Sequence, residues 1–312
     1  MLLAVASVAV GLAFLIAASD RLVASAVRIS QALGVSAVLI GALVVGLGTS
    51  LPELLVSAFA AVDGELDVAM GNVVGSNIAN VTLVIGAAAL LKPISTRIAV
   101  LRREGVLMLL AVIGLAVVLY DGEVTRFEGF ALLLGMVGAL VLLILWSQDH
   151  GPGDLVAADE VEEFTDGERS VGVEALIGII ALAATVFGAN LLLEGALDIG
   201  EDLGLSDSFL GVMLGIGTSL PELATAVAAA RRSAPDLVVG NVLGSNLFNS
   251  LAVAGTAAAV GPAVLLDLGR AELWFMVIAV TIAGVFARTG KLNRIEGGLL
   301  LAGFVAFLWL TF

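Results

Sequence analysis

Long runs of apolar residues, separated by short polar stretches, occupy most of this chain of 312 residues. A helix needs about 20 apolar residues to cross the roughly 30 Å hydrocarbon core of a bilayer. Ten runs approach or exceed that length, and they cover residues 2–18, 37–61, 68–91, 105–120, 127–146, 174–193, 208–230, 236–261, 271–288 and 294–312. The pattern predicts an all-α membrane protein with about ten transmembrane helices.

Composition agrees with this prediction and removes several classes of function. Hydrophobic residues make up 60% of the chain and charged residues only 13%, which excludes a soluble globular domain. The chain has no cysteine, so disulfides, thiolate metal sites and cysteine nucleophiles are excluded together. The net charge of −14 argues against a nucleic-acid partner. We expect membrane lipid and inorganic cations as partners, no cofactor, and a protein that functions as a monomer.

Two sequence blocks occur twice and divide the chain into halves. The block GTSLPEL stands at 48–54 and again at 217–223, and GN-V-x-GSN-x-x-N follows at 71–80 and 240–249, always with an offset of 169 residues. Between the halves lies a strongly acidic stretch without periodicity that contains Gly-Pro-Gly. We predict a first five-helix repeat at 1–146, an acidic cytoplasmic linker at 147–173 and a second five-helix repeat at 174–312.

The basic residues predict the orientation of these spans. Lys and Arg near membrane segments favour the cytoplasmic side. When the connections between the ten spans are assigned to alternate sides, twelve basic residues fall on one side and two, Arg126 and Arg270, fall on the other. This split predicts a multi-pass protein of the cell membrane with both termini outside and the acidic linker inside. The first span of each half then runs in opposite directions, so the repeats are inverted.

The first repeated block predicts a broken helix that carries a buried acid. Pro52 lacks a backbone donor and clashes with the preceding turn, which kinks or opens a helix. Backbone groups freed inside a membrane are tolerated only where they face protein, water or an ion. Thr49 and Ser50 place hydroxyl oxygens beside the break, and Glu53 follows within one turn. The second half repeats this arrangement with Thr218, Ser219, Pro221 and Glu222.

The second repeated block adds more oxygen atoms. Ser76 and Asn80 are four residues apart and so share one face of a helix, as do Ser245 and Asn249 in the second half. Hydroxyls, amides, carboxylates and freed carbonyls are hard donors of the kind that calcium prefers, and sodium also binds oxygen. Soft metals find no suitable ligand here.

The lack of a predicted basic partner indicates the role of the two acids in the apolar runs. A carboxylate at the centre of a membrane costs about 2.5–3.5 kcal/mol even on insertion scales. All fourteen basic residues are predicted in loops or at span ends, so Glu53 and Glu222 have no obvious basic partner within the membrane. Their charge must be met by bound cations or by protons. A kink, a packing glycine or a helix-bonded serine would each be unremarkable alone, but their joint recurrence at one offset favours a cation site.

The paired blocks GTSLPEL…GNVVGSNIAN and GTSLPEL…GNVLGSNLFN resemble the two alpha-repeats of the cation/calcium exchanger family, most closely its prokaryotic sodium/calcium exchangers. The resemblance covers nearly the whole chain and implies two inverted five-helix repeats with broken helices around a midplane cation site. It implies that Glu53 and Glu222 are central cation ligands. The other ligands that it implies are the hydroxyl or carbonyl oxygens of Thr49, Ser50, Thr218 and Ser219, the carbonyls of Gly46 and Gly215, Ser76 and Ser245 at sodium sites, and Asn80, paired with Asn249, at the centre.

One departure from the family pattern concerns the charge of the site. Exchangers of this kind usually carry Asp at one of the two last motif positions, whereas both Asn80 and Asn249 are amides here. The site then holds a formal charge of −2, which neutralises one calcium ion but suits several sodium ions less well.

The sequence therefore predicts a secondary transporter and not an enzyme: an antiporter that exchanges calcium for sodium by alternating access. A proton-coupled exchanger of calcium or another divalent cation is the alternative, because protons could also neutralise the two glutamates. A channel is disfavoured because an inverted two-repeat chain does not naturally build a symmetric pore ring. An intramembrane protease is disfavoured because the four flanking hydroxyls would have no purpose.

Overall fold

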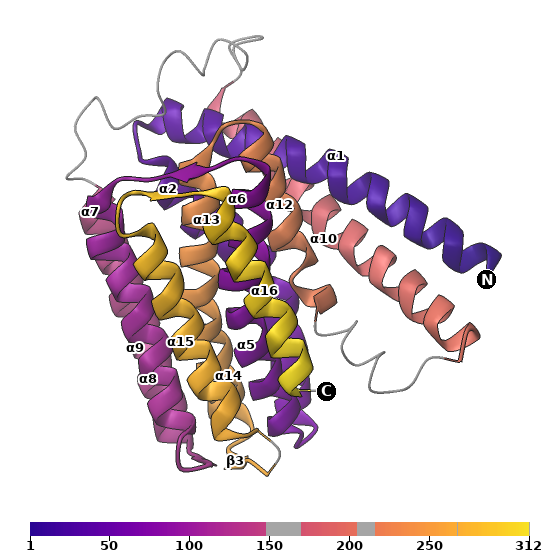
Figure 1. Cartoon of the computed structure of the whole chain (residues 1–312), viewed down its shortest axis with the longest axis vertical. Helices are drawn as coiled ribbons and strands as arrows, with labels where there is room; N and C mark the ends of the chain where they lie inside the picture. Colours follow the sequence, from indigo (N-terminus) through magenta and orange to yellow (C-terminus); the bar gives the residue numbers. More distant parts are fainter. Residues whose placement is uncertain (148–169, 205–215, 267, 312) are drawn as a thin grey trace.

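The computed structural model describes residues 1–147, 170–204, 216–266 and 268–311. Within these ranges the chain is helical apart from four two-residue strands and short connecting turns. Figure 1 shows most helices running along the long axis of the molecule, while α1 (Leu2–Leu33) and α10 (Val171–Asp202) lie beside them as a crossing pair. The prediction of an all-α protein is confirmed. Most of the predicted linker, and Gly215, lie outside the described residues.

The first half continues after α1 with short helices joined by π-helical turns. Its remaining helices are α2 (Ala37–Ile40), α3 (Leu47–Thr49), α4 (Leu51–Val62), α5 (Leu66–Ala79), α6 (Ile85–Leu91), α7 (Ile98–Val100), α8 (Val106–Leu119) and α9 (Arg126–Ser147). Its π-helical turns are η1 (Gly41–Gly46), η2 (Asn80–Val84) and η3 (Leu101–Gly105). Its strands are β1 (Ile94–Ser95) and β2 (Glu123–Val124).

The second half repeats this order as far as it is described. After α10 its helices are α12 (Leu220–Arg231), α13 (Pro235–Leu247), α14 (Ala254–Val260), α15 (Arg270–Ala287) and α16 (Arg294–Thr311). The π-helical turn η7 (Phe248–Val253) corresponds to η2, and the strands are β3 (Ala263–Val264) and β4 (Lys291–Leu292).

The described helices follow the ten predicted spans. Each predicted span coincides with one helix or with consecutive helical segments, the seventh only from residue 216 onward. By length and composition alone, six described helical segments could cross a membrane. The bent pair 37–49 and 51–62, which meets at 43°, is a seventh candidate. The other predicted spans coincide with described helical segments outside this set.

The first span extends further than its apolar run. We expected a helix over residues 2–18 with Arg21 and Arg28 in the following loop, but α1 continues without a break to Leu33. Both arginines on this extension contact Glu174 of α10, at 2.6 Å and 3.4 Å, and Ser25 also donates to it at 2.9 Å. Glu174 is almost fully buried, so this end of the α1–α10 contact is polar and compensated.

The strands show that the two halves are inverted relative to each other. Strand β1 pairs with β4, and β2 pairs with β3, both antiparallel. In the repeat, β1 corresponds to β3 and β2 to β4, so each pair joins one strand from each half. Figure 1 shows the β1–β4 pair at one end of the molecule and β3 at the other. Equivalent connections therefore lie at opposite ends, as inverted repeats require.

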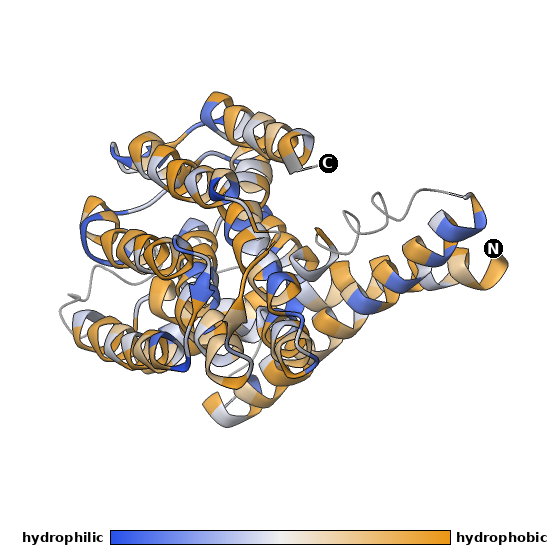
Figure 2. Ribbon diagram, turned by 90° about the horizontal axis from the view of Figure 1, so that it is seen from below, coloured by the Kyte–Doolittle hydropathy of each residue, from blue (hydrophilic) through white to orange (hydrophobic). Residues whose placement is uncertain are grey.

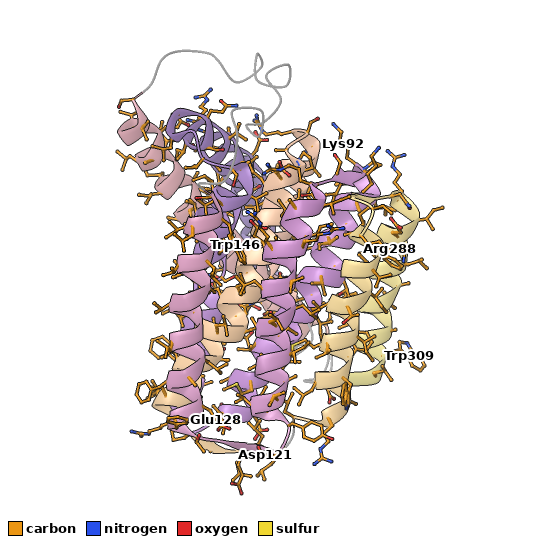
Figure 3. All side chains as sticks on the ribbon, turned by 90° about the vertical axis from the view of Figure 1, so that its left-hand side faces the viewer. Lys92, Asp121, Glu128, Trp146, Arg288 and Trp309 are labelled. Atoms are coloured by element: carbon orange, nitrogen blue, oxygen red, sulfur yellow. The ribbon has the colours of Figure 1, made fainter. Side chains whose placement is uncertain are left out.

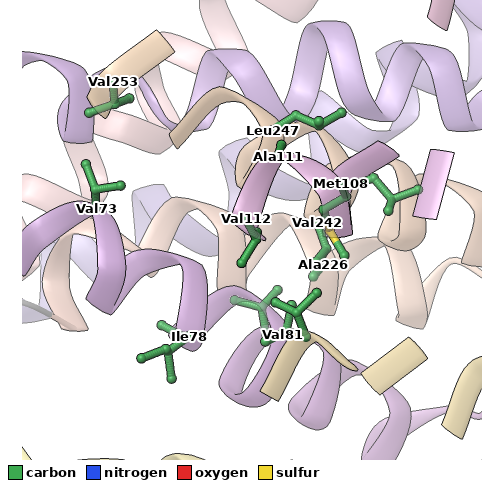
Figure 4. Close-up of a cluster of buried hydrophobic side chains, with 14 of the residues drawn as sticks. Val73, Ile78, Val81, Met108, Ala111, Val112, Ala226, Val242, Leu247 and Val253 are labelled. Atoms are coloured by element: carbon green, nitrogen blue, oxygen red, sulfur yellow. The ribbon is translucent and has the colours of Figure 1, made fainter. Parts of the chain in front are cut away.

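The two halves are packed into each other and do not sit side by side. Gly129 of α9 contacts the backbone of α14, where an added Cβ would come within 2.5 Å of Ala259. In the same way Gly297 of α16 contacts α6, with an added Cβ 3.0 Å from the carbonyl oxygen of Gly86. The last helix of each half thus lies against a central helix of the other. A continuous apolar core joins them, and Figure 4 shows part of it.

The outer surface suits a lipid environment. Figure 2 shows that hydrophobic residues prevail along the helices. Large apolar side chains such as Phe127 and Trp309 are more than 80% exposed, which is expected where lipid replaces water. Charged residues gather toward the ends: in Figure 3, Lys92 and Arg288 lie at one end of the helices and Asp121 and Glu128 at the other.

Candidate functional site

The predicted breaks in the repeated helices are present and alike in both halves. Ser50, with φ −87° and ψ 10°, separates α3 from α4 at the 43° bend. Ser219 precedes α12 with nearly the same backbone angles, φ −90° and ψ 7°. In each half a proline stands in the first turn after the break, as expected for a residue that cannot donate to the preceding turn.

The two repeated acids lie inside the molecule. Glu53 of α4 and Glu222 of α12 are both 0% exposed, and they are close enough to interact electrostatically. The hydroxyl of Ser50 donates to Oε1 of Glu222 at 2.8 Å. The broken helix of the first half therefore reaches the acid of the second, and the site is shared between the repeats.

Many polar atoms near these breaks have no hydrogen-bond partner among the described residues. Buried polar groups in native proteins are normally paired, so a concentration of unpaired ones marks a place for a ligand or water. The unpaired atoms in the repeated blocks include both carboxylate oxygens of Glu53, Oε2 of Glu222, the hydroxyls of Ser76 and Ser219, and both amide atoms of Asn80 and of Asn249. These are mostly oxygen atoms, which is the chemistry of a hard-cation site.

The other predicted residues are bonded to nearby oxygen atoms. Thr49 donates to the carbonyl of Val45 at 2.9 Å, and Ser245 donates to the carbonyl of Gly46 at 3.2 Å. Thr218 donates to the amide oxygen of Asn72 at 3.4 Å. The structure thus places every predicted site residue except Gly215 in one of the two broken regions or on the helices that pack against them.

Two asparagines of the site were missed by sequence reasoning. Asn72 of α5 donates to the carbonyl of Glu53 at 3.4 Å and to the hydroxyl of Ser57 at 3.0 Å. Asn241 of α13 does the same for Glu222, at 3.2 Å, and for the hydroxyl of Thr225, at 3.0 Å. Each asparagine ties the acid-bearing helix to the next helix. They follow the glycine that opens the second repeated block, so their recurrence was visible in the sequence.

The helices beside the acids contain π-helical turns at matching places. Asn80 is the first residue of η2, and Asn249 is the second residue of η7. A π-helical turn widens the helix by one residue and is frequent at functional sites. Both turns therefore change the direction of the side chains that follow Ser76 and Ser245. They do so at Asn80 and Asn249, whose amides have no hydrogen-bond partner among the described residues.

Small residues bring the first half's broken helix against α13. An added Cβ at Gly46 would lie 2.7 Å from the carbonyl oxygen of Asn241, and one at Gly244 would lie 2.3 Å from that of Ala42. Only glycine permits this approach of two backbones. The packing positions the carbonyl of Gly46 next to Ser245.

Within the described ranges, basic side chains do not compensate the two acids. No described lysine or arginine lies within 4.0 Å of Glu53 or Glu222. Arg21 and Arg28 pair with Glu174, and Arg232 pairs with Asp20. No group of three or more His, Cys, Asp or Glu side chains comes together in the described part of the chain.

Comparison with known proteins shows the family. The family model described as sodium/calcium exchanger protein matches residues 3–145 and 173–312. The chain belongs to this family. It is a multi-pass membrane transporter of the cation/calcium exchanger type and not an enzyme.

Named relatives and a solved structure agree over most of the chain. The sodium/calcium exchanger MaX1 of Methanosarcina acetivorans is 34% identical over 97% of this chain and 96% of its own length. A Ca²⁺/H⁺ antiporter of a Synechocystis strain is 28% identical over 80% of this chain and 76% of its own. The structure of the sodium-calcium exchanger NCX_Mj, soaked with Na⁺ and Sr²⁺, superposes with a TM-score of 0.86 at 29% identity, covering 99% and 98% of the two chains.

Proposed function

We propose that this exchanger is an antiporter that moves calcium in exchange for sodium by alternating access. Glu53 and Glu222 are the central cation ligands. The remaining ligands are the hydroxyl or carbonyl oxygens of the broken helices, the carbonyls of Gly46 and Gly215, Ser76 and Ser245, and the amides of Asn80 and Asn249. The observation that supports this most strongly is the pair of fully buried acids, with no described basic partner, amid unpaired oxygen atoms.

Exchange follows from sharing one site. Calcium and sodium would use the same carboxylates, so they cannot be bound together. An empty site would leave two charges buried without compensation, which is costly. A site loaded with either cation would be compensated and free to change access. The protein would therefore cross between its two open states only when loaded, which couples the movement of one ion to the other.

The decisive experiment removes both charges. We expect the double variant Glu53→Gln/Glu222→Gln, reconstituted in vesicles, to lose sodium-driven uptake of labelled calcium. The matched control is Glu128→Gln/Glu296→Gln, an equivalent pair of partly exposed residues that accept from Thr125 and Asn293 at helix starts. Glutamine can still serve in such a cap, so the control should transport normally. Full exchange by the first variant would refute the assignment.

Proton coupling is the second candidate function. The amides at both Asn80 and Asn249 leave two carboxylates, and two protons neutralise them as well as one calcium ion does. The similarity to a Ca²⁺/H⁺ antiporter points the same way. Vesicles loaded with calcium, and given either a sodium gradient at equal pH or a pH gradient without sodium, separate the two. Efflux with the sodium gradient alone supports sodium exchange, and efflux with the pH gradient alone supports the second candidate.

The proposed orientation has both termini outside. The chain has no cysteine, so single cysteines can be introduced without removing native ones. We expect Asp121→Cys to react with an impermeant maleimide added outside intact cells, and Thr289→Cys to react only after the cells are opened. The two residues are equivalent in the repeat and follow α8 and α15. The reverse labelling pattern would show that the orientation is wrong.

A further inference from the structure

A cavity lies away from the ion site, between α8, α13 and α15. Its volume is about 350 Å³, within the roughly 300–1,000 Å³ range of ligand pockets. Its walls are almost wholly apolar, for example Leu109 of α8, Val239 of α13 and Ala283 of α15. The flanking side chains Val106 and Val285 are about half exposed, so the cavity borders the surface that faces lipid.

One end of this cavity is basic. Arg288 and Lys291, at the end of α15 and in β4, are part of its lining, and Figure 3 places Arg288 at the same end of the molecule as Lys92. Neither Arg288 nor Lys291 forms an ion pair with any described residue. The cavity thus combines an apolar interior with two free positive charges at its rim.

The inverted repeat supplies an internal comparison. From Glu104 and Glu272 through α8 and α15, the halves correspond at an offset of 168 residues, as Met108 and Met276 also show. The offset continues to Gly122 and Gly290, whose φ angles are 80° and 77°. At the opposite end, Gly284 and Arg288 are replaced by Ala116 and Tyr120, and Val106 by Trp274.

Bulky side chains meet at that opposite end. The rings of Tyr120 and Trp274 lie edge to face, with centroids 6.5 Å apart, and Arg270 lies 4.8 Å from the centre of the Tyr120 ring. Lys291 has an acidic equivalent there, Glu123. Among the described residues, the positions equivalent to Val106, Arg288 and Lys291 are therefore filled by aromatic or acidic side chains at the opposite end.

We propose that this cavity binds one anionic phospholipid of the bilayer, with an acyl chain between α8, α13 and α15 and its phosphate between Arg288 and Lys291. Basic pockets between transmembrane helices on the cytoplasmic side are suited to anionic headgroups. An apolar space of this size would gain no water, whereas an acyl chain fills it. The inference does not depend on which ions the protein exchanges.

The bound chain would touch the helix that serves the ion site. Val239 of α13 lines the cavity, and Asn241 and Ser245 of the same helix contact Glu222 and Gly46. Lipid binding would therefore stabilise the position of α13 in the folded protein.

The test measures the rise in melting temperature that an anionic lipid, phosphatidylglycerol, causes in purified protein in neutral detergent, relative to phosphatidylcholine. A ligand that binds only the folded state raises it. We expect Arg288→Gln/Lys291→Gln to lose more than half of this rise. The control Arg102→Gln/Arg231→Gln removes two exposed charges outside the cavity lining and should keep it. An equal loss in the control would mean general surface attraction and would overturn the proposal.

A second variant tests the acyl chain. An added Cβ at Gly284 meets no atom within 4 Å, so Gly284→Leu can fill the cavity while leaving both basic residues in place. We expect it to lose the lipid-induced rise as well. Gly138→Leu, at an exposed site on α9 with equal free space, is the control and should retain it. Retention by Gly284→Leu would show that no chain enters the cavity.

A third experiment uses the unaltered protein, so its result does not depend on whether the variants fold. Phosphatidylglycerol with a photoreactive acyl chain should cross-link to peptides that contain Val239 or Ala283. Adducts confined to other helices, such as α9, would contradict the proposal.

Discussion

The hydroxyl groups of Ser50 and Ser219 distinguish two otherwise equivalent residues of the site. Ser50 donates to Glu222 at 2.8 Å, whereas Ser219 is buried with no partner in the described chain. Both backbones have nearly the same conformation, so the difference lies in the groups that surround each hydroxyl. The pair therefore separates the effect of a hydrogen bond to a buried acid from the effect of losing a hydroxyl.

We expect Ser50→Ala to destabilise the ion-free protein more than Ser219→Ala. A hydrogen bond to a charged group contributes about 1.5–3 kcal/mol, whereas removing an unpaired hydroxyl relieves a buried polar group. Melting in the presence of a chelator should show the lower temperature for Ser50→Ala. Equal melting temperatures for the two variants would mean that the bond to Glu222 contributes nothing to stability.

The amide of Asn80 leads to a second prediction at this scale. Asn80→Asp would add a third carboxylate to a site of formal charge −2 and would favour the binding of additional positive charge. We expect calcium uptake by this variant to depend more steeply on the sodium gradient than in the unaltered protein. Asn249→Asp, its equivalent in the second half, provides the comparison. An unchanged sodium dependence in both variants would show that the amides do not limit sodium binding.

The sequence predicted the acids but not all of their partners. Glu53 and Glu222 could be found because a carboxylate in an apolar run is rare and both copies recur. Asn72 and Asn241 recur at the same offset, but an asparagine has several common structural roles, so its presence does not identify a partner. Which carbonyl it reaches depends on how α4 packs on α5, and a single sequence does not specify that packing.

At the scale of helices, the contact between η1 and α13 depends on glycine. We expect Gly244→Ala to destabilise the protein by at least about 1–3 kcal/mol, the usual cost of overpacking, because its Cβ would lie 2.3 Å from a backbone oxygen. Gly298→Ala is the control, since a Cβ there meets no atom within 4 Å. That change should stabilise α16 by about 0.5–1 kcal/mol. Thermal melting that gave both variants the same sign of shift would contradict this account.

The broken helices were predicted and the π-helical turns were not. A proline lacks the backbone N–H donor at a known position, so Pro52 and Pro221 predict the breaks at Ser50 and Ser219. A π-helical turn only shifts hydrogen bonds by one residue, and no residue type marks it. The turns η2 and η7 form where α5 and α13 are packed on both sides. The length of α1 was also underestimated because it depends on a contact with a helix distant in sequence: Glu174 of α10 stabilises its polar end.

At the scale of the whole molecule, an ion pair breaks the symmetry of the two halves. Arg232, after α12, pairs with Asp20 of α1. At the offset of 169 residues the equivalent positions carry Asp63 and Ala189, which cannot form such a pair. The other end of the molecule therefore lacks this connection between a helix of the crossing pair and the central helices.

This asymmetry gives a prediction about the balance between the two access states. The pair holds α1 to α12 at the end that carries Lys92, so it favours states in which that end is closed. Partly exposed ion pairs contribute about 0–1 kcal/mol, which corresponds to a shift of up to about fivefold in the ratio of two states. We expect Arg232→Gln to raise the labelling rate of a single cysteine placed at Ser36 within this limit.

Two control variants test this explanation. Asp20→Arg/Arg232→Asp should restore the original rate, because it rebuilds the pair with reversed charges. Lys92→Gln, which removes a nearby charge bonded to Ser233 and not to α1, should leave the rate unchanged. A faster rate in Lys92→Gln as well, or no restoration by the reversed pair, would mean that local charge and not the connection controls access.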